Sequence, residues 1–129
     1  MENAFLKTKK TDNVIEVLLG NQPGTLEIND HEVFQNSLKQ VITWKLAKAL
    51  QSGDFTSFAW VDPSNASGTF DTPEISPDGN ALTIGDHNGP AGKKGHLAYI
   101  ITIELGGVSY SSRTSATQQM IKDPVIINR

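Results

Sequence analysis

The sequence predicts an all-β domain, an antiparallel β-sandwich of Greek-key or immunoglobulin-like type with about seven to nine strands. Short segments rich in β-branched and aromatic residues recur along the chain, and glycine, proline, asparagine and aspartate separate them. Helical periodicity is weak by comparison. The 129 residues are expected to form one domain, residues 1–129, long enough to bury roughly two-thirds of the unfolded surface without disulfides.

In the first half of the chain, strands are predicted at residues 13–19, 26–28 and 40–46. Residues 13–19 alternate in polarity and end at a glycine- and proline-containing turn. Residues 31–34 fit either one helical turn or a strand. Leu38, Val41 and Ile42 have helical spacing, but the sequence Val41-Ile42-Thr43-Trp44 is rich in residues that favour strands, and we therefore assign 40–46 as a strand.

In the second half, strands are predicted at residues 55–61, 81–85, 97–105, 108–112 and 125–127. Residues 62–79 are expected to be mostly connection, with one short edge strand at 69–71. The clearest strand is 97–105, in which Tyr99, Ile101, Ile103 and Leu105 share one face. We expect the final strand to pair with it, which would bring Asp123 close to an end of that strand.

Composition limits the partners and cofactors that are expected. Eleven basic and fourteen acidic residues give a net charge of −3, with no basic stripe for nucleic acid or an anionic membrane. Cysteine is absent, and the three histidines, His31, His87 and His96, lack metal-binding spacing. No cofactor or metal is therefore predicted, and no small-molecule ligand is assigned. The start of the sequence lacks an apolar leader, which favours a cytoplasmic protein.

Two Asp-Pro bonds carry the most unusual chemistry in the sequence. Asp62-Pro63 fits an ordinary turn, with proline at its second position. Asp123-Pro124 directly precedes an apolar strand at the end of the sequence. An aspartate carboxylate can attack its own backbone carbonyl to form a cyclic anhydride, and proline is a good leaving group because its amide nitrogen is tertiary.

The closing sequence Asp123-Pro124-Val125-Ile126-Ile127-Asn128, together with the all-β pattern, resembles the bacterial DP-EP (Asp-Pro endopeptidase) family of self-cleaving β-sandwiches. The resemblance implies a single-turnover autocatalytic endopeptidase that hydrolyses its own Asp123-Pro124 bond. The severed strand would stay docked and could support self-assembly into a homo-oligomer by strand exchange. The ending is also similar to that of the AidA/PixA-type inclusion-body proteins, which implies an architectural role for the motif.

Several residues are candidates to assist the reaction. Asp62, Asp86 and Glu104 each end or border a predicted strand, and His96 lies beside the strand 97–105. Either Asp123 attacks its own carbonyl, or a neighbouring carboxylate activates a water molecule. A lysine could instead trap the acyl group as an isopeptide, and the candidates for this are Lys45, Lys93, Lys94 and Lys122. The alternative is a non-catalytic β-sandwich, structural or ligand-binding, in which Asp123-Pro124 starts an edge strand.

Overall fold

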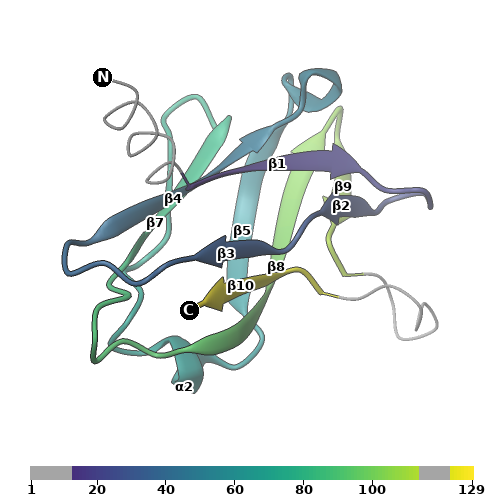
Figure 1. Cartoon of the computed structure of the whole chain (residues 1–129). Helices are drawn as coiled ribbons and strands as arrows, with labels where there is room; N and C mark the ends of the chain where they lie inside the picture. Colours follow the sequence, from purple (N-terminus) through teal and green to yellow (C-terminus); the bar gives the residue numbers. More distant parts are fainter. Residues whose placement is uncertain (1–12, 114–122) are drawn as a thin grey trace, which may run out of the picture.

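The computed structural model describes residues 13–113 and 123–129, which fold into two β-sheets packed face to face (Figure 1). The ten strands described are β1 (Asn13–Leu19), β2 (Leu26–Ile28), β3 (His31–Val33), β4 (Gln40–Leu46), β5 (Asp54–Trp60), β6 (Glu74–Ile75), β7 (Ala81–Asp86), β8 (Gly95–Leu105), β9 (Val108–Ser111) and β10 (Val125–Asn128). Two single turns of helix, the 3-10 turn η1 (Lys48–Leu50) and α2 (Pro63–Ala66), lie between strands. No helix in the described part of the chain is long and apolar enough to cross a membrane.

The first sheet has the strand order β2-β1-β4-β7-β6. Its strands alternate buried and exposed residues: in β1, Ile15 and Val17 face the core, whereas Val14 and Glu16 face outward. This period of two is what a sheet with one covered face requires. β1 pairs parallel with β4, and the other pairings in this sheet are antiparallel.

The second sheet has the order β3-β10-β8-β5, and β9 pairs with the far half of β8. β10 is antiparallel to β8 and parallel to β3, so it is an interior strand of this sheet. Residues 102–104 of β8 pair with β5 and with β9 at the same time. β9 and β10 therefore follow one another along the same edge of β8.

Aromatic side chains fill the space between the sheets. Trp44 and Tyr99 are fully buried, and the Trp44 Nε1–H donates to the Tyr99 hydroxyl at 2.9 Å. The Phe58 ring stacks on the Tyr99 ring with centroids 5.2 Å apart, and Trp60 meets Phe58 edge to face at 4.9 Å. These rings join β4, β5 and β8 into one core.

The predicted all-β sandwich is confirmed, and most strands lie within one or two residues of their predicted bounds. The sheets are mixed rather than purely antiparallel, the described strands number ten rather than seven to nine, and the Greek-key arrangement is not confirmed. Of the two alternatives for residues 31–34, a helical turn or a strand, the structure shows the strand, β3. The expected edge strand at 69–71 is reduced to a single bridge between Phe70 and Asp86, while β6 and α2 were not predicted.

Two expectations about the final strand need correction. β10 pairs with β8 as predicted, but Pro124 lies beside Tyr99, so Asp123 comes close to the middle of β8 rather than to one end. The non-catalytic alternative places Asp123-Pro124 at the start of an edge strand, and this placement alone is wrong, because β10 has hydrogen-bonded neighbours on both sides. The sequence pattern of β10 could not distinguish these positions, since both of its faces are largely apolar.

Candidate functional site

The Asp123-Pro124 bond lies at the junction of β9 and β10, alongside the middle of β8. The backbone N–H of Tyr99 donates to the carbonyl of Pro124 at 3.1 Å. Two residues further along β8, Ile101 exchanges hydrogen bonds with Ser112: its N–H donates to the Ser112 hydroxyl and its carbonyl accepts from the Ser112 N–H, each at 2.9 Å. The chain leaving β9 and the chain entering β10 are thus attached to neighbouring positions of one strand.

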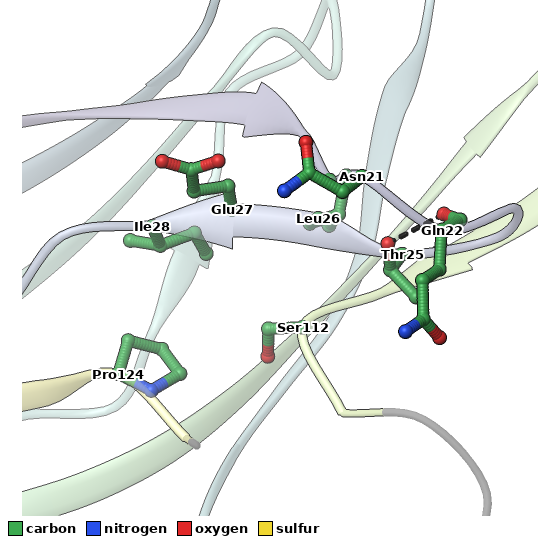
Figure 2. A pocket seen from close by; sticks show the side chains of 9 residues that line it. Asn21, Gln22, Thr25, Leu26, Glu27, Ile28, Ser112 and Pro124 are labelled. Atoms are coloured by element: carbon green, nitrogen blue, oxygen red, sulfur yellow. Dashed lines mark hydrogen bonds between the residues drawn. The ribbon is translucent and has the colours of Figure 1, made fainter. Parts of the chain in front are cut away.

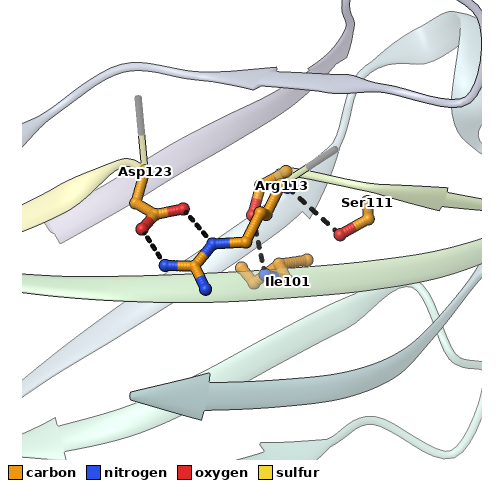
Figure 3. A network of polar contacts seen from close by, with 5 residues as sticks. Ile101, Ser111, Arg113 and Asp123 are labelled. Carbon is orange, nitrogen blue, oxygen red and sulfur yellow. Dashed lines mark hydrogen bonds and ion pairs between the residues drawn. The ribbon is translucent and has the colours of Figure 1, made fainter. Parts of the chain in front are cut away.

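This arrangement brings Arg113 to Asp123, as Figure 3 shows. The Arg113 Nε–H donates to Asp123 Oδ1 at 3.0 Å, and Nη2 donates to Oδ2. The pair is bidentate, the geometry in which guanidinium and carboxylate interact best. The Asp123 side chain is only 18% exposed, and contact with it raises the pKa of Arg113. The carboxylate beside the Asp-Pro bond is therefore held by a permanent cation.

On the other side of the bond, an anion contacts the first residue of β10. Asp30 lies in the turn between β2 and β3, where the chain passes from one sheet to the other. Its Oδ1 accepts a hydrogen bond from the Val125 N–H at 3.1 Å. The side chain thus binds a backbone donor just beyond the end of the β3–β10 pairing, where β3 offers no further partner.

A cavity opens beside Pro124, lined by residues of the β1–β2 hairpin and by Ser112 (Figure 2). Its volume is about 230 Å³, which is enough space for several water molecules. Polar side chains line it, among them Asn21, Gln22 and Glu27. Solvent therefore has a route to the proline side of the bond.

The four helper residues predicted from the sequence do not gather at this bond. Glu104 lies on β8 five residues beyond Tyr99, which binds Pro124, and this separation is roughly 17 Å along the strand. His96 pairs with Ile127, on the other side of Val125 from the bond. Asp86 lies in the first sheet and contacts Asn128, at the far end of β10.

Asp62 and His96 do come together, but elsewhere. They line a cavity of about 140 Å³ with Trp60 and Asn65. Asp62 precedes the first turn of α2, and its two carboxylate oxygens accept hydrogen bonds from Ser64 at 2.7 Å and Asn65 at 3.1 Å. The carboxylate of this second Asp-Pro sequence is thus engaged by its own turn.

Among the described residues, no lysine contacts Asp123. Lys94 donates to Asn88 Oδ1 and to the Gly89 carbonyl, and Lys45 lies on β4 in the other sheet. The backbone N–H of Lys93 is bound to Thr69. Lys122, the last predicted trap, lies outside the described residues.

The sequence did not predict the roles of Asp30 and Arg113, which are the two charged residues in the described part of the chain that contact the segment around the bond. Asp30 is 95 residues from Val125, and no motif connects the two. Arg113 directly follows the predicted strand 108–112 and belongs to no element predicted from the sequence. The one signal available is charge: Arg113 and Lys122 are the only basic residues of the segment 113–124, in which Asp123 is the only acidic residue.

Comparison of the sequence with models of known protein families finds no match, and comparison with curated proteins finds none either. The likeness to the self-cleaving family therefore stays a prediction.

Proposed function

We propose that the domain is an autocatalytic endopeptidase that hydrolyses its own Asp123-Pro124 bond once and keeps the C-terminal strand docked. The observation that carries the proposal is the placement of charge. A guanidinium contacts the Asp123 side of the bond, and a carboxylate contacts the strand on the Pro124 side. Hydrolysis creates a carboxylate on the first side and a secondary ammonium on the second. Arg113 and Asp30 are therefore in place to stabilise the two charges that cleavage produces.

In the reaction that we propose, one oxygen of the Asp123 carboxylate attacks the Asp123 carbonyl carbon. Both oxygens contact Arg113 in the structure, so one must leave the guanidinium while the other remains. A C–O bond forms, the C–N bond to Pro124 breaks, and the proline nitrogen takes up a proton from solvent. Water then opens the cyclic anhydride and leaves Asp123 as a new C-terminus. Holding the carboxylate and carbonyl in one compact arrangement is worth up to ~7–11 kcal/mol of the barrier.

The contacts of β10 support retention of the severed segment. Ile126 is fully buried, and the strand is hydrogen-bonded to β3 and β8. At its end, the Arg129 N–H donates to the Val33 carbonyl at 2.9 Å, and the Arg129 guanidinium pairs with Glu32. All of these contacts are made by residues on the C-terminal side of the bond, so they do not depend on the bond being intact.

The test uses two substitutions with matched controls, each followed by intact mass over several days. Asp123→Asn removes the nucleophile and is expected to abolish the species that ends at residue 123. Asp62→Asn, in the other Asp-Pro sequence, is expected to leave its formation unchanged. Asp30→Asn is expected to slow cleavage on the order of tenfold, which corresponds to about 1.4 kcal/mol of lost charge stabilisation.

The control for Asp30→Asn is Asp78→Asn, because Asp78 is also exposed and also accepts a backbone hydrogen bond, from Asn80 at 3.0 Å. Cleavage in Asp78→Asn is expected to match the unmodified protein. Equal rates for Asp30→Asn and Asp78→Asn would remove Asp30 from the mechanism. Cleavage that persists in Asp123→Asn would overturn the anhydride route.

A second candidate function is a non-catalytic sandwich that assembles or binds a ligand. It is favoured by the bidentate contact of Asp123, which engages both carboxylate oxygens, and by the cavity beside Pro124. Under this function the Arg113–Asp123 pair anchors β10, and an exchange of β10 between copies gives a homo-oligomer. Size-exclusion chromatography with light scattering on the same samples distinguishes the two: oligomers in protein of intact mass support assembly without cleavage.

A further inference from the structure

A buried acid–amide pair lies at the far end of β10 from Asp123. Asp86 is the last residue of β7 and is 0% exposed, and Asn128 is the last residue of β10 and is 2% exposed. The Asn128 Nδ2 donates to Asp86 Oδ1 at 3.2 Å and to the Lys93 carbonyl at 3.0 Å. The pair therefore connects the C-terminal strand to the opposite sheet.

Each of the two side chains has one buried oxygen that accepts no hydrogen bond from any described residue. These atoms are Asp86 Oδ2 and Asn128 Oδ1. A buried ionised carboxylate with an unpartnered oxygen is unfavourable, because it has lost its hydration without full compensation. A proton on Oδ2 removes the charge and turns this oxygen into a donor. The amide oxygen of Asn128, on the side chain already bonded to Asp86 Oδ1, also lacks a donor and is therefore an available acceptor for this proton.

The charged groups around Asp86 do not replace the proton. They lie on four neighbouring segments and have other partners: His87 and Lys39 pair with Asp71, Lys94 binds Asn88 and Gly89, and Arg129 pairs with Glu32. Burial raises the pKa of Asp86 to about 6, although the hydrogen bond from Asn128 and the charges of His87 and Lys94 act in the opposite direction. Desolvation thus outweighs every favourable contact of the ionised form.

We propose that Asp86 is protonated in the folded protein at mildly acidic pH and shares this proton with Asn128, so that the hold on the C-terminal strand is pH-dependent. Acid and amide then exchange two hydrogen bonds, and ionisation at higher pH breaks one of them. The proposal concerns the uncut protein and does not depend on the Asp123-Pro124 reaction. If that reaction occurs, the same pair contributes to the affinity of the sandwich for the severed segment.

The direction of the pH effect follows from the two pKa values. The folded-state pKa, about 6, lies above the ordinary value of 3.8. Asp86 therefore contributes stability that is fully present below about pH 3.8 and is lost as the pH rises through about 6. The contribution of this residue to folding therefore falls between about pH 4 and about pH 7 and is constant at higher pH.

The test compares unfolding temperatures of the full chain and its Asp86→Asn variant at several pH values. Asparagine reproduces the shape and the donor of the protonated acid but cannot ionise. We expect the two proteins to unfold at similar temperatures at about pH 3.5, below both pKa values, and the variant to unfold several degrees higher at about pH 8. Asp54→Asn, at an exposed position, serves as the control and should follow the unmodified protein. Parallel pH profiles for Asp86→Asn and the unmodified protein would overturn the proposal.

A second measurement keeps the proposal testable if Asp86→Asn does not fold. The carboxyl carbon of Asp86 in the unmodified protein, followed by NMR, is expected to titrate with a midpoint near 6, and a midpoint below about 4 overturns the proposal. Calcium and magnesium provide a further check. A rise in unfolding temperature with either ion that is lost in Asp86→Asn would identify a cation at these oxygens and would also overturn the proposal.

Discussion

Tyr99 connects the core to the candidate site through two different parts of the same residue. Its hydroxyl accepts the Trp44 indole N–H inside the sandwich, and its backbone N–H donates to the Pro124 carbonyl. Burial raises the pKa of its phenol far above the ordinary value of 10, so it stays neutral throughout the accessible pH range. A buried core residue, Tyr99, thus helps to position the Asp123-Pro124 bond.

The substitution Tyr99→Phe tests how much the hydroxyl of Tyr99 contributes to the stability of the core. It removes the hydroxyl and leaves the fully buried Trp44 N–H without its acceptor, which is expected to lower the free energy of unfolding by ~1–3 kcal/mol. Urea unfolding followed by tryptophan fluorescence measures the change. Tyr110→Phe, on β9 and only partly buried, is the control and is expected to change stability by less than about 0.5 kcal/mol. Equal effects of the two substitutions would contradict this account of Tyr99.

Single-residue contacts across the fold are the part of the site that the sequence could not predict. Asp123 was singled out by chemistry that resides in two adjacent residues, Asp and Pro. Its partner Arg113 and the nearby Asp30 depend on which strands become neighbours, and local patterns carry no information on that. For the same reason, the sequence correctly placed Glu104 on the strand that pairs with β10 but could not show that it lies near the end of that strand, away from the bond.

At the scale of elements, alternation of polarity was enough to predict most strands. Ile101 and Ile103 are fully buried on the face predicted from the sequence. The short helix α2 was missed because Asp62-Pro63 is equally typical of a turn and of a helix start with proline in its first turn. The parallel pairings of β1 with β4 and of β10 with β3 were missed because strand pattern does not encode direction.

The interior position of β10 leads to a prediction for Ile126. This side chain is fully buried between the sheets, and Ile126→Ala is expected to lower the free energy of unfolding by ~2–5 kcal/mol, since it leaves a cavity in the core. Val108→Ala, where the side chain is 51% exposed on β9, is the matched control and should change stability by about 0.5 kcal/mol or less. Chemical denaturation measures both. A small effect of Ile126→Ala would mean that β10 is not an integral strand of the sheet.

At the scale of the whole molecule, the two ends of β10 carry different groups. One end carries the Asp123-Pro124 bond between Arg113 and Asp30, and the other carries the buried Asp86–Asn128 pair. The strand between them is held by hydrogen bonds on both sides and by core packing. Scission at the first end would therefore change the covalent structure without removing the strand from the sandwich.

The most direct test of the central claim is the intact mass of freshly purified protein, measured again after days at mildly acidic and at neutral pH, in native buffer and in urea. Self-cleavage by the fold predicts a species that ends at Asp123 together with the peptide of residues 124–129, appearing faster in the folded protein than in urea. A mass lowered by one water would indicate a trapped anhydride or a lysine cross-link. An unchanged mass in the folded protein, or equal cleavage in urea, would contradict self-cleavage by this fold.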